Sequence, residues 1–157
     1  MQLSFSCFLA AALALVPLSS AAPAPAGTIA LTKRQIGNLF PSDKFAACPN
    51  YRYSAPQAEA AAQEGVHRVP LANRINGYSH IFGNNRKIKF DPACYDLVLY
   101  EFPILPGGNI YSGGDPKADR VVFALSGQDP ANNGRFCGIM THDGAPEGEF
   151  NLCPIED

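Results

Sequence analysis

Positive charge is scarce in this sequence. The chain has 12 Lys and Arg residues against 14 Asp and Glu residues, a formal net charge of −2. Proteins that bind nucleic acids non-specifically through a broad positive field need an excess of cations, and this composition excludes that class. Any polyanion that the protein binds must be held locally, by a few well-placed groups.

Charged residues are absent from Met1 to Thr32, and Phe5 to Leu18 is almost wholly apolar. That apolar run is too short to span a bilayer as a mature helix, and the small residues at 19–22 are typical of a cleavage site. The pattern predicts a signal peptide over residues 1–21 and a pro-segment over residues 22–34 that ends in the dibasic pair Lys33-Arg34. We expect a secreted, extracellular protein whose mature form begins at Gln35 and has no membrane part.

The segment 35–157 is long enough for a single domain with one hydrophobic core. Without Lys33 and Arg34, 12 − 2 = 10 basic residues face 14 acidic ones, which gives a formal net charge of −4. Internal repeats, heptads and low-complexity tracts are absent from this segment. We therefore expect one acidic domain that acts as a monomer.

Closely spaced cysteine pairs are also missing, so the C-x-x-C ligand pair of a structural zinc site does not occur and we expect no metal. Cys7 leaves with the signal peptide, and Cys48, Cys94, Cys137 and Cys153 remain. An even number of cysteines in a small exported domain is typical of disulfides. Four cysteines allow three pairings, and their spacing does not choose among them.

Helix signals are confined to one segment. Ser54, Pro56 and Gln57 form a capping box, and the alanine-rich run 58–64 follows until Gly65, where we expect the helix to end. The chain beyond it alternates turn residues with short β-rich runs. We expect strands at 88–90, 97–105, 120–125 and 136–142. The fold class is therefore α+β, with one α-helix packed on a central antiparallel β-sheet.

Glu101 is the one carboxylate in the apolar run 97–105. A buried carboxylate is costly unless it is paired, so Glu101 either faces solvent at a strand end or has a function. Arg120 begins the next apolar run, His142 ends the last one, and His80 lies upstream. Because side chains alternate along a strand, these groups can converge on one face of the sheet. The set suits phosphoryl chemistry.

Each of these residues also has a structural interpretation. His80 could be a surface histidine, as we expect for His67, which belongs to no motif. Arg120 next to Asp119 could form a plain surface ion pair, and His142 could start a turn. The functional interpretation therefore depends on all of them occurring together.

Five short motifs occur in a fixed order, and together they carry a resemblance. They are Tyr78-Ser79-His80, Tyr100-Glu101-Phe102-Pro103-Ile104, Tyr111-Ser112-Gly113-Gly114, Ala118-Asp119-Arg120-Val121-Val122 and Gly138-Ile139-Met140-Thr141-His142. In this order they resemble the secreted microbial ribonucleases, which include guanyl-specific fungal enzymes of the T-one and N-one type and the ribotoxins related to α-sarcin. The resemblance extends from about Cys48 to Cys153. It implies the microbial ribonuclease fold and an endoribonuclease that acts on single-stranded or loop RNA.

The resemblance also implies a role for each matching residue. Glu101, supported by His80, would be the general base that takes the proton from the ribose 2′-hydroxyl, and His142 would be the general acid that protonates the departing 5′-oxygen. Arg120 would stabilise the charge on the phosphorane, Tyr78 would bind a phosphate oxygen, and Phe150 would pack near the scissile phosphate. The product would be a 2′,3′-cyclic phosphate, which can be hydrolysed to a 3′-phosphate. A base, an acid and a fixed cation are sufficient, so we expect no cofactor.

The segment after the first motif departs from the guanyl-specific pattern. Those enzymes follow an aromatic residue and an Asn-rich stretch with a Glu that accepts hydrogen bonds from guanine. This chain has Phe82, Asn84 and Asn85 followed by Arg86 and Lys87, and a cation cannot accept those bonds. We expect relaxed guanine selectivity, with the base held by stacking on Phe82 and by backbone groups of the two asparagines. The basic residues at 86–89 would face the RNA backbone.

The sequence around the cysteines is closer to the ribotoxins. The resemblance to that group implies disulfides Cys48–Cys153 and Cys94–Cys137, the second of which would tie the base to the acid. Ribotoxins are mostly strongly basic and have a long Lys-rich loop between the first histidine and the glutamate, whereas here the loop is short and the protein is acidic. Two alternatives stay open. One is a ribotoxin that cuts a ribosomal RNA loop, and the other is a non-catalytic effector that binds RNA or a host protein.

Overall fold

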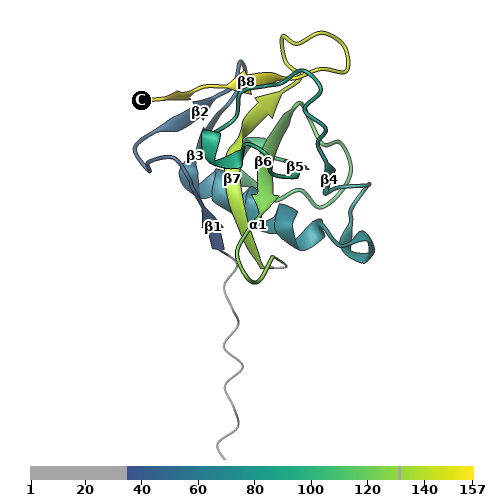
Figure 1. Cartoon of the computed structure of the whole chain (residues 1–157). Helices are drawn as coiled ribbons and strands as arrows, with labels where there is room; N and C mark the ends of the chain where they lie inside the picture. Colours follow the sequence, from purple (N-terminus) through teal and green to yellow (C-terminus); the bar gives the residue numbers. More distant parts are fainter. Residues whose placement is uncertain (1–34, 131) are drawn as a thin grey trace, which may run out of the picture. The chain divides into compact units, whose positions relative to one another are not determined.

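The computed structural model describes residues 35–130 and 132–157 (Figure 1). The expected signal peptide and pro-segment lie outside the described residues. Within the described part of the chain, no helix is long and apolar enough to cross a membrane.

The larger sheet has six strands, in the order β1-β7-β6-β5-β4, and β8 also pairs with β7 (Figure 1). The strands are β1 (Gln35–Gly37), β4 (His80–Ile81), β5 (Leu99–Pro103), β6 (Asp119–Leu125), β7 (Asn133–Thr141) and β8 (Asn151–Cys153). The pairs are antiparallel apart from β1, which runs parallel to the first residues of β7. The sheet is therefore mixed at one edge, where a wholly antiparallel sheet was expected.

A second sheet has three strands in the order β3-β2-β9, which are β3 (Arg52–Ser54), β2 (Phe45–Ala47) and β9 (Ile155–Glu156). Short 3₁₀ helices occupy Leu71–Asn73, Pro92–Cys94 and Pro106–Gly108. Two disulfides, Cys48–Cys153 and Cys94–Cys137, cross-link the fold. This is the pairing that the resemblance implies, and it ties the residue after β2 to β8 and the second 3₁₀ helix to β7.

Helix α1 (Ala55–Arg68) begins at its expected cap, where the side-chain oxygen of Gln57 accepts hydrogen bonds from the backbone N–H (2.9 Å) and the hydroxyl (3.1 Å) of Ser54. The expected end at Gly65 was wrong, since the helix continues to Arg68. Gly65 is instead a point of close approach to the sheet. A Cβ added there would lie 2.5 Å from Cε1 of Phe123, so the position has no room for a side chain.

The three longer strands coincide with the expected runs, and their ends differ by at most three residues. The strand expected at 88–90 was wrong, because the structure forms no strand there. The side chain of Asn84 instead binds both backbone groups of Ile88, accepting from its N–H (2.7 Å) and donating to its carbonyl (3.0 Å). These bonds, and a backbone bond from the N–H of Lys87 to the carbonyl of Asn84 (2.9 Å), close residues 84–88 into a loop.

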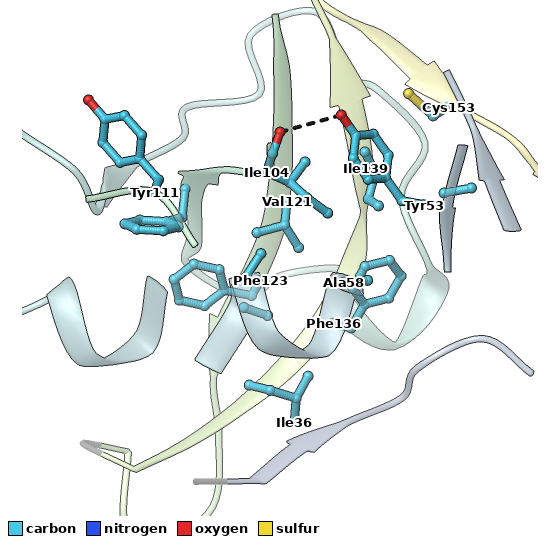
Figure 2. Close-up of a cluster of buried hydrophobic side chains, with 14 of the residues drawn as sticks. Ile36, Tyr53, Ala58, Ile104, Tyr111, Val121, Phe123, Phe136, Ile139 and Cys153 are labelled. Carbon is cyan, nitrogen blue, oxygen red and sulfur yellow. Dashed lines mark hydrogen bonds between the residues drawn. The ribbon is translucent and has the colours of Figure 1, made fainter. Parts of the chain in front are cut away.

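The alternation of side chains along the central strands gives the sheet two different faces. Val121, Phe123 and Ile139 pack into the cluster that contains the buried alanines of α1 (Figure 2). The intervening residues Val122 and Met140 belong to a second cluster. Since Glu101 and Arg120 alternate with residues of the first cluster along their strands, they lie on the face opposite α1.

Candidate active site

Glu101 and His80 form the centre of the site. They are directly paired residues of β5 and β4, and His80 Nε2 lies 2.6 Å from Glu101 Oε1. Glu101 is only 7% exposed, so the interpretation of a glutamate that faces solvent was wrong. The other ring nitrogen of His80 lies 3.3 Å from the carbonyl oxygen of Gly77. The register of a short strand therefore brings a half-exposed imidazole against a buried carboxylate.

Arg120, near the start of β6, is buried and rigidly held. Its Nη1 donates hydrogen bonds to the carbonyls of Pro116 (3.1 Å), Lys117 (2.8 Å) and Asp119 (2.9 Å). Its Nη2 donates to the hydroxyl of Tyr78 (3.0 Å), and the guanidinium lies 5.3 Å from the centre of that ring. The positive charge is thus fixed in place before any ligand binds.

Asp119, the neighbour of Arg120, points to the other side of the sheet. It is 2% exposed and accepts a hydrogen bond of 2.6 Å from the hydroxyl of Tyr53. Burial, together with this carboxylate, raises the pKa of Tyr53 far above its usual range. The interpretation of Asp119 and Arg120 as a surface ion pair was therefore wrong.

His142 follows directly after β7, and its backbone N–H donates to the carbonyl of Ala118 (3.1 Å). Its Nδ1 lies 2.6 Å from the carbonyl oxygen of Glu149. Because a carbonyl can only accept, Nδ1 carries the hydrogen and Nε2 is left for proton transfer. The ring stacks on Phe150 with centroids 3.7 Å apart. Burial, and then the charge of Arg120, lower the pKa of His142 below its ordinary value.

Two buried polar atoms of the site lack a hydrogen-bond partner among the described residues. They are Glu101 Oε2, an acceptor, and Arg120 Nε, a donor. Buried polar atoms in folded proteins nearly always have partners. The face of the sheet that carries the site therefore has an acceptor and a donor to which a bound molecule can form hydrogen bonds.

The residues expected to bind the base lie beside His142. Phe82, Asn84 and Asn85 line one side of a small pocket, and Phe150 lies on the other. The rings of Phe82 and Phe150 meet edge to face at 5.8 Å. The side chain of Asn84 braces its own loop and is not directed to a ligand.

One residue of this region was missed in the sequence. Glu149 forms an ion pair with Arg86, a partner that the expectation of Arg86 facing the RNA backbone did not include. Its only sequence signal is its place next to Phe150. Among residues 35–130 and 132–157, no group of three or more His, Cys, Asp and Glu side chains is arranged to hold a metal ion.

Comparison with known proteins agrees with this geometry. Residues 41–154 match the family model described as ribonuclease. Guanyl-specific ribonuclease Th1 of Trichoderma harzianum is 36% identical over 110 residues, covering 69% of this chain and 95% of that protein. Guanyl-specific ribonuclease Pc of Penicillium chrysogenum is 32% identical over 69% of this chain and 96% of that protein. Guanyl-specific ribonuclease N1 of Neurospora crassa is 30% identical over 90% of this chain and 92% of that protein. The chain belongs to this ribonuclease family and is an endoribonuclease of the cyclising type that acts on RNA.

Proposed function

We propose that Glu101 and His142 are the general base and the general acid of RNA cleavage. The 2′-oxygen forms a bond to phosphorus and gives its proton to Glu101, while the bond from phosphorus to the 5′-oxygen breaks and that oxygen takes a proton from His142 Nε2. The products are a 2′,3′-cyclic phosphate and a free 5′-hydroxyl. A positioned acid or base contributes about 10²- to 10⁴-fold to the rate.

Arg120 and Tyr78 supply the phosphate site in this proposal. The Tyr78 hydroxyl accepts a hydrogen bond from Arg120 Nη2, which leaves its own hydrogen free to donate to a phosphate oxygen. The unpaired Nε of Arg120 is a second donor for the same group. Charge fixed before the reaction stabilises the phosphorane without reorganisation.

The observation that carries the proposal is the contact between Glu101 and His80 on the face that also holds Arg120. The imidazole of His80 keeps the carboxylate oriented toward the site. The non-catalytic effector is not favoured, because all four ionisable groups are in place. The relatives named above are guanyl-specific ribonucleases and give no support to a ribotoxin.

The identity of the base before the cleaved phosphate is a separate part of the proposal. The names of the relatives favour guanine. Arg86 replaces the acidic residue of the guanyl-specific pattern, and this replacement taken alone favours relaxed selectivity. The outcome depends on which groups face a base that stacks on Phe82.

We further propose that the protein is exported and acts as a monomer with Gln35 as its first residue. Ile36 of β1 is part of the hydrophobic core, so a mature chain that begins at Gln35 keeps this core residue. Both disulfides are typical of proteins that leave the reducing cytosol.

The test is digestion of naked RNA by the oxidised 35–157 protein, with the product termini identified by chromatography. We expect 2′,3′-cyclic phosphate ends, and a loss of at least about a hundredfold in rate for His142→Ala. His67→Ala is the matched histidine control and should keep full activity. Absence of cleavage by the wild-type protein would overturn the proposal. A single discrete fragment from intact ribosomes, without general RNA degradation, would favour the ribotoxin.

A further inference from the structure

A pocket of about 140 Å³ lies between the Phe82 loop and the segment Gly148–Phe150. It adjoins the proposed acid, because Phe150 contacts Phe82 on one side and stacks on His142 on the other. A base held here belongs to a nucleotide whose phosphate lies at the catalytic groups. The pocket is therefore the place where sequence preference arises.

An ion pair between Arg86 and Glu149 joins the two walls of this pocket. The two partners are not equally accessible, since the side chain of Glu149 is 23% exposed and that of Arg86 is 64% exposed. The carboxylate is thus the inner member of the pair and the guanidinium lies at the rim. The loop has no acidic residue at position 86, but Glu149 on the opposite wall supplies a carboxylate to the pocket.

We propose that Glu149 is the group that selects the base, that the base is guanine, and that Arg86 holds the carboxylate in position. This inference rests on the proposed ribonuclease function. The ion pair joins Nη2 of Arg86 to Oε1 of Glu149. A carboxylate has about four lone-pair sites, so it can accept further hydrogen bonds beside this pair. Guanine presents two neighbouring donors, N1–H and the 2-amino group, and a carboxylate can accept both at once.

The guanidinium of Arg86 complements the same base. It has five N–H donors in a fixed fork, and those not used by Glu149 can donate to O6 of guanine, a frequent acceptor for arginine. The ion pair thus offers an acceptor next to a donor. Adenine, cytosine and uracil do not present two adjacent donors beside an acceptor.

The pocket is built rigidly enough for such a task. The Asn84 side chain holds the loop closed at Ile88, and both Asn84 (φ 43°) and Lys87 (φ 54°) adopt left-handed backbone conformations. Strained backbone of this kind is often found at ligand sites. On the opposite wall, the backbone carbonyl of Glu149 holds His142, so one residue contacts both the proposed acid and the pocket.

The competing interpretation is that the ion pair only straps the two loops together. A strap would support His142 equally for every substrate, so its loss would slow cleavage after all four bases by the same factor. A group that selects the base changes the ratio between bases. That ratio is the readout that separates the two interpretations.

The experiment measures kcat/KM of the secreted, disulfide-bonded protein on the four dinucleoside phosphates GpC, ApC, CpC and UpC. We expect the wild-type protein to prefer GpC. Glu149→Gln should lower kcat/KM for GpC by about tenfold to a hundredfold and leave the other three nearly unchanged. Glu147→Gln is the matched control, because Glu147 is exposed and lies outside the pocket, and it should match wild type on all four substrates.

Three other outcomes would contradict the inference or the proposed function. An equal loss on all four substrates for Glu149→Gln would overturn the inference in favour of a strap. Equal cleavage of all four by the wild-type protein would overturn it while the proposed function stands, and no cleavage of any would overturn the proposed function. If Glu149→Gln is not secreted, a second measurement tests the inference. It compares the affinities of guanosine and adenosine 3′-monophosphates for the wild-type and Arg86→Gln proteins. We expect tighter guanosine binding that weakens in the variant, and equal affinities in the wild-type protein would refute the inference.

Discussion

Replacement of Glu101 by Gln removes the proposed base with little change of shape. The amide keeps an oxygen that can accept from His80 Nε2, which now lies 2.6 Å from the carboxylate, but it cannot take a proton from a 2′-hydroxyl. If Glu101 is the general base, kcat should fall by about 10²- to 10⁴-fold, which corresponds to about 3–5 kcal/mol of lost transition-state stabilisation.

The same substitution should hardly change the stability of the fold. One oxygen of Glu101, Oε2, is buried without a hydrogen-bond partner among the described residues, so the carboxylate is already poorly satisfied. Exchanging it for an amide replaces one unpaired polar atom by another. We expect the free energy of unfolding to change by no more than about 1 kcal/mol, which urea denaturation can measure.

His80→Ala and the double variant show whether the histidine acts through Glu101. If His80 only orients the carboxylate, the double variant should be about as slow as Glu101→Gln alone. If the two residues act independently, their losses should multiply. His80 would then contribute to catalysis by a route that does not pass through Glu101.

The assay is single-turnover cleavage of a dinucleoside phosphate, followed by chromatography of the cyclic product. Single-turnover conditions separate the chemical step from product release. His67→Ala serves as the control for a histidine outside the site. Near-normal activity of Glu101→Gln in a folded protein would refute the assignment of the base.

Three further predictions concern the acid, the disulfides and the helix. Burial and Arg120 lower the pKa of His142, and a general acid acts only while it is protonated. We therefore expect kcat/KM to fall as the pH rises, with a midpoint below the ordinary pKa of histidine. Phe150→Ala exposes the ring and should move this midpoint to higher pH. Reduction of the disulfides, which close loops of 105 and 43 residues, should lower the melting temperature, since the loop-entropy model gives about 5 and about 4 kcal/mol for them; an unchanged melting temperature would contradict this. Gly65→Ala should lower the free energy of unfolding in urea, because overpacking of about 1–3 kcal/mol exceeds the helix-propensity gain of about 1 kcal/mol; a more stable variant would show that the helix can shift.

The parts of the fold with a long, regular pattern could be predicted from the sequence. The capping box at Ser54 marked the start of α1, and three apolar runs marked the central strands. Strands of two or three residues, such as β1 and β4, are too short to show a period. The end of the helix was missed because Gly65 is required by contact with Phe123, which is a tertiary effect.

The site was predictable to a similar degree. Alternation along strands placed Glu101 and Arg120 on one face, and the structure agrees. The contact between His80 and Glu101 depends on the register of β4, which a two-residue strand does not reveal. The partnership of Arg86 with Glu149 joins two loops, and loops carry no periodic signal that brings their side chains together.

Adjacent residues along the central strands face opposite sides of the sheet, so a residue of the site can lie next to a residue of the helix-side core. Along β5 and β6, neighbouring residues such as Arg120 and Val121 serve the site and the helix-side core in turn. In a mutational scan, substitutions of Glu101 and Arg120 should therefore lower activity, whereas substitutions of their neighbours Phe102 and Val121 should lower the yield of folded protein.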